Sequence, residues 1–203
     1  MKTKATYYSL MLAAVVFLFA SCGEKKNERT EDHADHEHTT SSEVEEATTK
    51  PQFDVSQEFQ SQLAKVFTAY VELKDAFVSS NSVTVKAESA DVQQSLNGVD
   101  MKLLSGAAHN DWMTFSSGLQ KSLDEIKATS DIEAQRKSFS TLSDNLYKSI
   151  KAFGLGGEEA YYEFCPMAFD DAGGYWLSDV DQIRNPYFGN KMLSCGEVVE
   201  KLQ

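Results

Sequence analysis

The sequence predicts a mainly α-helical protein: an up-and-down four-helix bundle over residues 54–154, with a C-terminal tail of short strands and ordered loops, residues 155–203, packed on it. Apolar residues recur at spacings of three and four through the first segment, which is the period of amphipathic helices. Such helices, joined by short connections, bury their stripes only against one another, which favours an antiparallel bundle. After Gly156-Gly157 the helical period is lost and Tyr, Phe, Trp, Gly and Pro become frequent, which is typical of strands and loops.

The first two predicted helices have recognisable boundaries. The first is expected to begin near Val55, with Ser56 or Asp54 as N-cap, and a break at residues 79–82 separates it from the second, which ends at Asn97-Gly98. Their predicted inward-facing residues are Phe59, Leu63, Val66, Phe67, Tyr70, Leu73 and Phe77 in the first helix, and Val85, Ser89, Val92, Leu96 and Val99 in the second.

The third and fourth helices are predicted from the same period. The third runs from about Ala107 to Lys127, and the fourth begins at Ser130, where Ser130-x-x-Glu133 resembles a capping box, and ends at Gly154. Their predicted inward-facing residues are Ala108, Trp112, Phe115, Leu119, Leu123 and Ile126, then Ile132, Phe139, Leu142, Leu146, Ile150 and Phe153.

Residues 1–21 are predicted to be a lipoprotein signal peptide. Lys2 and Lys4 form a basic start and an apolar run follows, too short for a comfortable membrane span. The window LFASC resembles a lipobox, in which the signal is cleaved before Cys22 and that cysteine is acylated. The alternative is an ordinary secretory signal cut nearby. In either case we expect the mature chain outside the cytoplasm, and with the lipid it is anchored to the membrane at the periplasmic face or the cell surface.

Residues 22–53 are predicted to be a disordered acidic tether, because they contain too little apolar surface to offset chain entropy. Within the tether, His33, His36 and His38 alternate with carboxylates, a pattern that indicates a loose accessory metal tract. The alternative is a merely solvated linker. The formal net charge of the chain, -12, argues against a nucleic acid partner, which requires clustered Lys and Arg.

Four sulfur-containing side chains, those of Cys165, Met167, Met192 and Cys195, lie in the tail. Thiolate and thioether are soft ligands that select Cu(I) and related ions over Mg²⁺ or Ca²⁺. On an extended backbone Cys165 and Met167 face the same side, Met192 and Cys195 converge in a turn, and a rigid turn at residues 185–189 brings the two pairs together. We therefore predict a site for Cu(I) or another soft metal ion. One alternative is a Cys165-Cys195 disulfide that fixes the tail, since an even pair of cysteines in an oxidising compartment permits one. The other is a pair of free buried thiols that only pack in the core.

A further pair, His109 and Met113, lies one helical turn apart on the third helix. Imidazole and thioether on one face of a helix form a usable half-site for Cu(I), so the two residues are possible completing ligands. The alternative is a partly buried histidine with no ligand role.

An enzyme is not expected. The sequence contains no Gly-x-Ser-x-Gly elbow, phosphate-binding loop or paired-histidine zinc helix. A thiol nucleophile would have to pair Cys165 or Cys195 with His109, without any other local signal.

Four segments of the chain are distinctive: AYVELKDAFVSSN, DIEAQRKSFSTLSDNLYKSIKAFGL, CPMAFDDAGGYWLS and IRNPYFGNKMLSCGEV. With these segments the chain resembles domain-of-unknown-function family 3347 over about residues 59–198. Such domains occur in exported lipoproteins and joined to periplasmic adaptor subunits of copper and silver efflux systems, so the resemblance implies a heavy-metal context and an efflux adaptor as partner. YYEFCPM is also similar to a short heavy-metal-binding segment of those adaptors, in which Cys165 and Met167 match and Ala168 replaces the usual His.

The sequence thus supports two hypotheses. The first is a membrane-anchored extracytoplasmic lipoprotein that binds Cu(I) or Ag(I) for sequestration or hand-over to efflux. The second is a non-catalytic structural or interaction module of the cell envelope, with a Cys165-Cys195 disulfide and an aromatic docking surface. That surface would include Tyr161, Tyr175, Trp176 and Tyr187.

Overall fold

The structure, a computed structural model, describes residues 50–203. The predicted signal peptide, Cys22 and the tract from His33 to His38 lie outside the described residues. Within the described part, no helix is both long enough and apolar enough to cross a bilayer.

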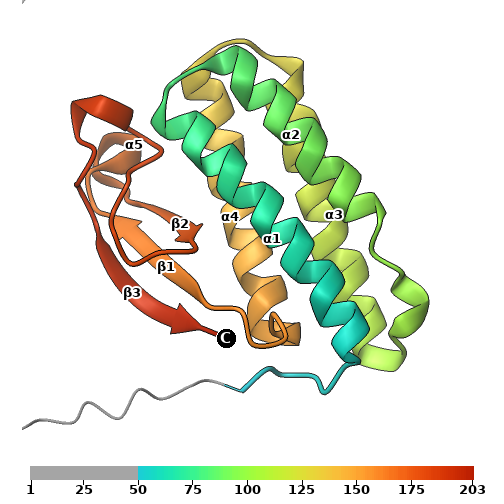
Figure 1. The fold of residues 1–203 in the computed structure, drawn as a ribbon. Coiled ribbons are helices and arrows are strands. Elements are labelled where there is room, and N and C mark those ends of the chain that lie inside the picture. Colours follow the sequence, from blue (N-terminus) through green and yellow to red (C-terminus); the bar gives the residue numbers. More distant parts are fainter. Residues whose placement is uncertain (1–49) are drawn as a thin grey trace, which may run out of the picture. The chain divides into compact units, whose positions relative to one another are not determined.

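Four long helices form the predicted up-and-down bundle (Figure 1). They are α1 (Gln57–Val78), α2 (Ser82–Asn97), α3 (Gly106–Ala128) and α4 (Ile132–Phe153). A short 3₁₀ turn, η1 (Met101–Leu103), lies between α2 and α3. The main helix contacts join α1 with α2, α2 with α3 and α3 with α4, as consecutive antiparallel neighbours require.

The helix boundaries follow from capping side chains. Ser56 is the N-cap of α1 and its hydroxyl accepts a hydrogen bond from the Phe59 amide at 3.3 Å, as expected of one of the two candidates. The predicted capping box at Ser130 is wrong. The N-cap of α4 is Asp131, whose carboxylate accepts a hydrogen bond from the Glu133 amide, and a carboxylate is a strong cap beside the positive end of the helix dipole. Gly154, with φ of 71°, ends α4 as predicted.

The predicted inward-facing stripes form the core of the bundle. Phe139 is fully buried and lies between the rings of Tyr70 and Phe77, with ring centroids 5.2 and 4.5 Å away. Trp112 packs edge-on against Phe59 at the end of the bundle where α1 begins. Ala108, Phe115 and Ile132 are only partly buried, because they lie at the margins of the stripes.

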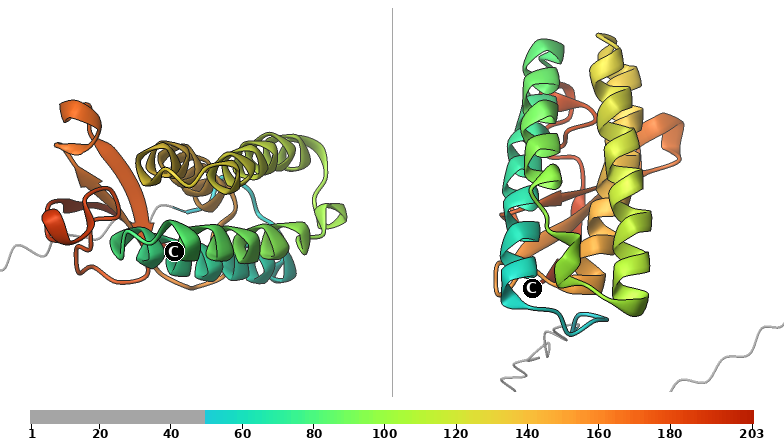
Figure 2. Two further views of the ribbon diagram at one scale, coloured as in Figure 1. Left: turned by 90° about the horizontal axis from the view of Figure 1, so that it is seen from above. Right: turned by 90° about the vertical axis from the view of Figure 1, so that its right-hand side faces the viewer.

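The tail folds into a three-stranded antiparallel sheet of order β2-β1-β3. Its strands are β1 (Ala160–Cys165), β2 (Gly174–Ser178) and β3 (Glu197–Leu202). A short helical turn, α5 (Ala168–Asp171), connects β1 with β2, and the 3₁₀ turn η2 (Gly189–Lys191) lies in the loop before β3. The sheet packs beside the bundle, with β2 against α4 and α1 (Figures 1 and 2). The prediction of short strands and ordered loops is confirmed.

Tyr187 joins the tail to the bundle. Its ring packs edge-on against Phe139 of α4 and Trp176 of β2, with centroids 6.1 and 5.8 Å away, and its hydroxyl donates a hydrogen bond to the Tyr175 carbonyl. Trp176 is fully buried and Tyr187 nearly so. The bundle and the tail therefore share one core and belong to one compact unit.

Two residues inside the predicted bounds of the tether, 22–53, pack against the bundle. The Gln52 and Phe53 amides donate hydrogen bonds to the Lys151 and Ala152 carbonyls, and the Phe53 ring stacks on Phe153 at 5.6 Å. Residues 52 and 53 are thus part of the domain, because Phe53 supplies an aromatic ring that the rest of the tether lacks.

Candidate soft-metal site in the tail

The two tail cysteines meet in the folded chain. The Sγ atoms of Cys165 and Cys195 lie 2.7 Å apart, and both residues are free thiols in this structure. Cys165 is the last residue of β1 and fully buried, whereas Cys195 lies in the turn before β3 and is half-buried. Thirty residues of chain therefore close into a loop at this point.

Asn185 holds the Cys195 turn in place. Its carboxamide oxygen accepts hydrogen bonds from the Tyr187 and Phe188 amides, which forms the predicted rigid turn, and its Nδ2 donates to the Cys195 carbonyl at 2.7 Å. The Cys195 amide in turn donates to the Met192 carbonyl at 3.1 Å. Met192 and Cys195 therefore lie in one turn anchored by fully buried Asn185, but the Met192 side chain lines a pocket that Cys195 does not line.

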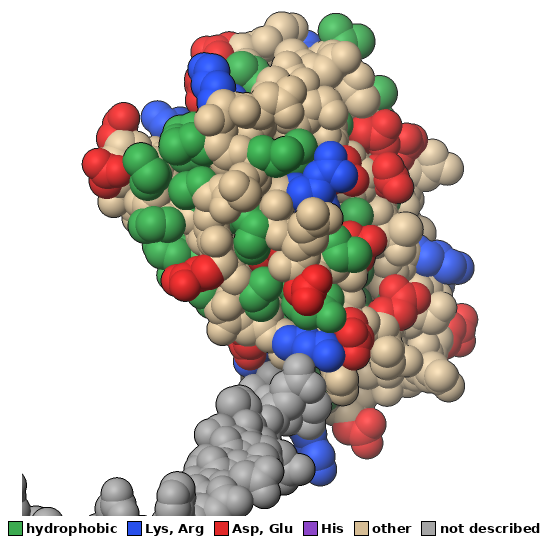
Figure 3. Space-filling view, turned by 60° about the vertical axis from the view of Figure 1, so that its left-hand side comes forward, with side chains coloured by type: hydrophobic (Ala, Val, Ile, Leu, Met, Phe, Trp, Pro, Cys, Tyr) green, Lys and Arg blue, Asp and Glu red, His purple; other side chains and the backbone are tan. Residues whose placement is uncertain are grey.

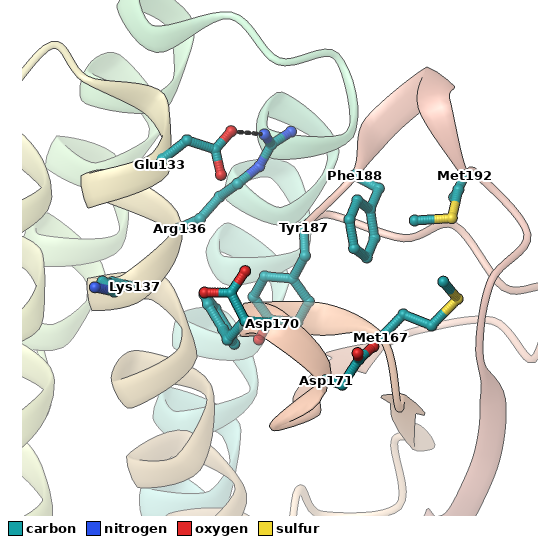
Figure 4. A pocket seen from close by; sticks show the side chains of 10 residues that line it. Glu133, Arg136, Lys137, Met167, Asp170, Asp171, Tyr187, Phe188 and Met192 are labelled. Carbon is teal, nitrogen blue, oxygen red and sulfur yellow. Dashed lines mark hydrogen bonds and ion pairs between the residues drawn. The ribbon is translucent and has the colours of Figure 1, made fainter.

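Met167 and Met192 line one pocket of about 630 Å³ at the end of the tail (Figure 4). Figure 4 shows the thioether of Met167 extended toward that of Met192 on the same side of the pocket. The Met167 side chain is 48 % exposed. The prediction that Cys165 and Met167 face the same side is wrong. The backbone leaves the extended conformation at Met167 (φ -87°, ψ -7°), so Cys165 points into the core and Met167 into the pocket.

The edge of the pocket contains three consecutive non-glycine residues with left-handed backbone: Phe169, Asp170 and Asp171, with φ of 55°, 57° and 66°. Each such residue costs about 1 kcal/mol or more, and Asp tolerates the conformation better than most. The Phe169 ring packs against Tyr187, at a centroid distance of 4.9 Å. Strained backbone of this kind concentrates at functional sites, which supports a role for this end of the tail.

Arg136 forms the floor of the pocket on the α4 side. This buried guanidinium pairs with Glu133 at 2.6 Å and donates hydrogen bonds to the Pro186 carbonyl at 2.9 Å and the Ser80 hydroxyl at 2.9 Å. Its charge is therefore fully used in joining the tail loop, α4 and the turn after α1. Lys137, Asp170 and Asp171 are the exposed charges at the pocket edge.

The hydrogen bond with Cys165, together with burial, raises the pKa of the Cys195 thiol to about 11. At neutral pH this thiol is therefore protonated. A metal ion that binds Cys195 must displace a proton, because the thiolate is the metal ligand.

His109 and Met113 do not reach the sulfur cluster. Both flank Trp112, whose ring lies 6.1 Å from that of Phe153 at the end of α4, whereas the pocket adjoins Arg136 at the start of α4. The helix from position 136 to position 153 spans about 25 Å. Met113 is 44 % exposed and points into a different surface pocket, beside Met101. The two residues therefore cannot complete a site in the tail.

The cysteine pair permits two chemical states. Metal–sulfur distances near about 2.3 Å hold two thiolates of one ion roughly 4 Å apart, so a metal would require the sulfurs to separate by about 1 Å. A disulfide, with a bond of about 2.0 Å, would require them to approach by less than about 1 Å. Among residues 50–203 no three His, Cys, Asp or Glu side chains gather as a metal-binding group. A soft-metal site there would therefore consist of the two thiols and the methionines.

Sequence reasoning missed a buried polar cluster beneath the cysteines. Glu163 is fully buried on β1 and neither carboxyl oxygen has a hydrogen-bond partner, nor does the neighbouring Trp176 Nε1. Burial raises the pKa of Glu163 to about 8, against the opposing effect of the nearby Lys74 charge. Lys74 is itself buried and contacts Asp75 at 3.3 Å and the Ser178 hydroxyl at 3.4 Å. A lone Glu between two aromatic residues of a strand was the only local signal.

The surface of the tail exposes apolar side chains. Met167, Tyr175, Leu193, Val198 and Val199 are each 38 to 48 % exposed. Figure 3 shows hydrophobic side chains spread over the face on the sheet side, with carboxylates and lysines among them. The sequence predicted an aromatic docking surface that included Trp176 and Tyr187. For these two residues the prediction is wrong, because both are core residues that join the tail to the bundle.

Comparison with known families gives one match. Residues 66–158 match the family described as "Protein of unknown function (DUF3347)". No curated protein and no solved structure matches the chain. The matched segment begins within α1 and ends before β1, so it covers the bundle and not the sulfur cluster. Residues 66–158 of the chain are therefore similar to domain-of-unknown-function family 3347.

Proposed function

We propose that this protein is a membrane-anchored lipoprotein outside the cytoplasm that binds a soft metal ion, Cu(I) or Ag(I), for sequestration or hand-over to an efflux system. In this proposal it is not an enzyme. Cys165 and Cys195 hold the ion, Met167 and Met192 belong to the same site, and the tract from His33 to His38 is an accessory collector.

One observation carries the proposal: two thiols thirty residues apart lie 2.7 Å from each other, in a tail that also directs two thioethers into one pocket. Sulfur ligands of this kind select Cu(I) and Ag(I). The lipobox-like window and the family resemblance supply the compartment and the heavy-metal context.

A competition titration tests the proposal. The full chain is reduced and titrated with Cu(I) in the presence of a coloured Cu(I) chelator, with His33, His36 and His38 replaced by Ala in every sample so that the tract does not contribute. We expect Cys165→Ser with Cys195→Ser to weaken Cu(I) binding by about a hundredfold or more, because two thiolate ligands are lost. His109→Ala is the matched control and should leave the affinity unchanged, since His109 lies at the other end of the bundle. Unchanged affinity in the double Cys variant would overturn the proposal.

The second candidate function is a non-catalytic interaction module whose tail is fixed by a Cys165-Cys195 disulfide. The same short sulfur distance favours it, as do the exposed Tyr175, Val198 and Val199 on the sheet. Closing a loop of about thirty residues would stabilise the fold by roughly 3 to 4 kcal/mol in the chain-entropy model.

Thiol counting on protein isolated without reductant separates the two candidates. Two reactive thiols that become protected when Cu(I) is added support metal binding. Thiols that react only after reduction support the disulfide.

A further inference from the structure

We propose that Met167 and Met192 form a separate, solvent-facing thioether site that receives the soft metal ion first and passes it to the Cys165 and Cys195 thiols. This inference rests on the proposed function. It assigns the four sulfur residues to two successive metal sites, one of thioethers and one of thiols. The juxtaposition that carries it is a pair of thioethers in one pocket, exposed at Met167 and half-buried at Met192, joined by short chain segments to a thiol pair that is buried at Cys165 and half-buried at Cys195.

The contrast in exposure supports the division. Cys165 is fully buried, and neither cysteine lines the pocket, whereas Met167 is 48 % exposed and both methionines line it. An ion that arrives from solvent at this pocket therefore meets thioether sulfur before thiol sulfur. Figure 4 shows the Met167 thioether extended toward the side of the pocket where Met192 lies.

Short segments of chain connect the thioether site with the thiol site. Only Pro166 separates Met167 from Cys165, and the Cys195 amide is hydrogen-bonded to the Met192 carbonyl. An ion held between the two thioethers is thus attached to both segments that carry a cysteine. The exposed carboxylates of Asp170 and Asp171 at the pocket edge favour a cation over an anion.

The chemistry of the transfer is ligand exchange without redox change. The ion stays in the +1 state, its bonds to thioether sulfur break, and bonds to thiolate sulfur form as the thiol protons leave to solvent. A neutral thioether needs no deprotonation, so it binds quickly at neutral pH.

Stopped-flow mixing of the reduced full chain with the coloured Cu(I)–chelator complex tests the division, again with the three tether histidines replaced by Ala. We expect Met167→Leu with Met192→Leu to slow Cu(I) uptake by about tenfold or more while the equilibrium Kd changes by less than about threefold, because the thiols still hold the ion. Leu is close to Met in volume and keeps the pocket packed. Met101→Leu is the matched control, since Met101 is similarly exposed, at 42 %, but lies in the other pocket beside Met113. Unchanged uptake rates in the double Met variant would overturn the inference. A parallel tenfold loss of affinity would also overturn it, because the thioethers would then be permanent ligands.

Ag(I) titration followed by NMR of ¹³C-labelled methionine methyl groups distinguishes failure of this inference from failure of the proposed function. In the variant with Cys165→Ser and Cys195→Ser, the Met167 and Met192 methyl signals should still shift with Ag(I), while Met101 should not. Shifts at Met167 and Met192 together with unchanged overall affinity would leave the thioether site standing and remove the thiol site. No shift at either methyl group would remove the thioether site, whatever the thiols do.

Discussion

The helical bundle and the C-terminal tail differ in how their residues are packed and in how much backbone strain they contain. In the bundle, most buried positions are apolar at helical spacing, although Lys74 and Arg136 are buried there too, and the helix ends are capped by ordinary side chains such as Ser56 and Asp131. The tail contains three successive left-handed residues, an unpaired buried carboxylate at Glu163, and two thiols in contact. The run of left-handed residues and the contact between two thiols thus both lie in the smaller region. This distribution indicates that the bundle supplies folding free energy and the tail supplies the site.

The largest expected effect concerns Phe139, a bundle residue that contacts both the bundle and the tail. Phe139→Ala should lower the free energy of unfolding by about 3 to 5 kcal/mol, because its fully buried ring packs against Tyr70 and Phe77 of the bundle and Tyr187 of the tail. Urea denaturation followed by circular dichroism measures the change. Val83→Ala, at a position 79 % exposed, is the control and should change it by less than about 0.5 kcal/mol. A small effect of Phe139→Ala would mean that the tail is not docked on the bundle.

Glu163 should make the stability of the protein fall as the pH rises. Its pKa is about 8 in the folded protein and near the ordinary 4.5 in the unfolded chain, so between these values the unfolded chain has already lost the proton that the folded protein keeps. The contribution of this group to the free energy of unfolding is complete below pH 4.5 and is lost progressively up to pH 8, by up to about 5 kcal/mol.

Glu163→Gln removes that titration. Thermal denaturation between pH 5 and pH 8 should show a flatter profile for the variant, which becomes more stable relative to the wild type as the pH rises. Asp91→Asn, at an exposed position of α2, is the control and should keep the wild-type slope. Parallel profiles for wild type and Glu163→Gln would show that Glu163 is not protonated at neutral pH.

Arg136→Met should lower the free energy of unfolding by about 2 kcal/mol, because the Pro186 carbonyl and the Ser80 hydroxyl each lose a charged hydrogen-bond donor. Arg136→Lys should not restore this stability, since the ammonium group of Lys cannot reproduce the planar set of donors that a guanidinium offers. Lys137→Met, one residue further along and exposed, is the matched control. Chemical denaturation gives the values, and equal midpoints for the Arg136 and Lys137 variants would contradict the bridging role.

The smallest expected effect has opposite signs in the two regions. Asp170→Gly should stabilise the protein by about 1 kcal/mol, because glycine adopts the left-handed backbone at φ of 57° without steric cost. Asp91→Gly, in the middle of α2, should destabilise it by about 1 kcal/mol through lost helix propensity. Destabilisation by both changes would show that Asp170 contributes contacts that outweigh its strain.

The bundle could be predicted from the sequence because its signals are local. Apolar residues at spacings of three and four place each stripe, and Gly98 and Gly154 mark two ends to the residue. The error at Ser130 has the same local origin: Asp131, one position later, offers a carboxylate to the same amide groups and caps the helix instead.

The tail could be predicted only in outline, because its contacts are non-local. Nothing near Cys165 in the sequence shows that Met167 leaves the extended backbone, or that Glu163 is covered by the rest of the tail. The misplacement of His109 was avoidable. In an antiparallel bundle α3 begins at the end where α1 begins, so His109 lies at that end. The strand β1 runs from the end of α4 back toward its start, so Cys165 lies toward the opposite end. Counting the chain reversals in the sequence would therefore have separated His109 from Cys165.

The chain has two tryptophans, and the fold assigns one to each region. Trp112 packs between Phe59 and Phe153 at one end of the bundle, while Trp176 lies in the tail beside Tyr187, against the backbone at Gly196. The molecule therefore carries a separate intrinsic fluorophore for its scaffold and for its sulfur-bearing end. With Trp112 replaced by Phe, the remaining emission comes from one indole in the tail, and its wavelength and lifetime report on the surroundings of that indole, which include Tyr187 and Gly196.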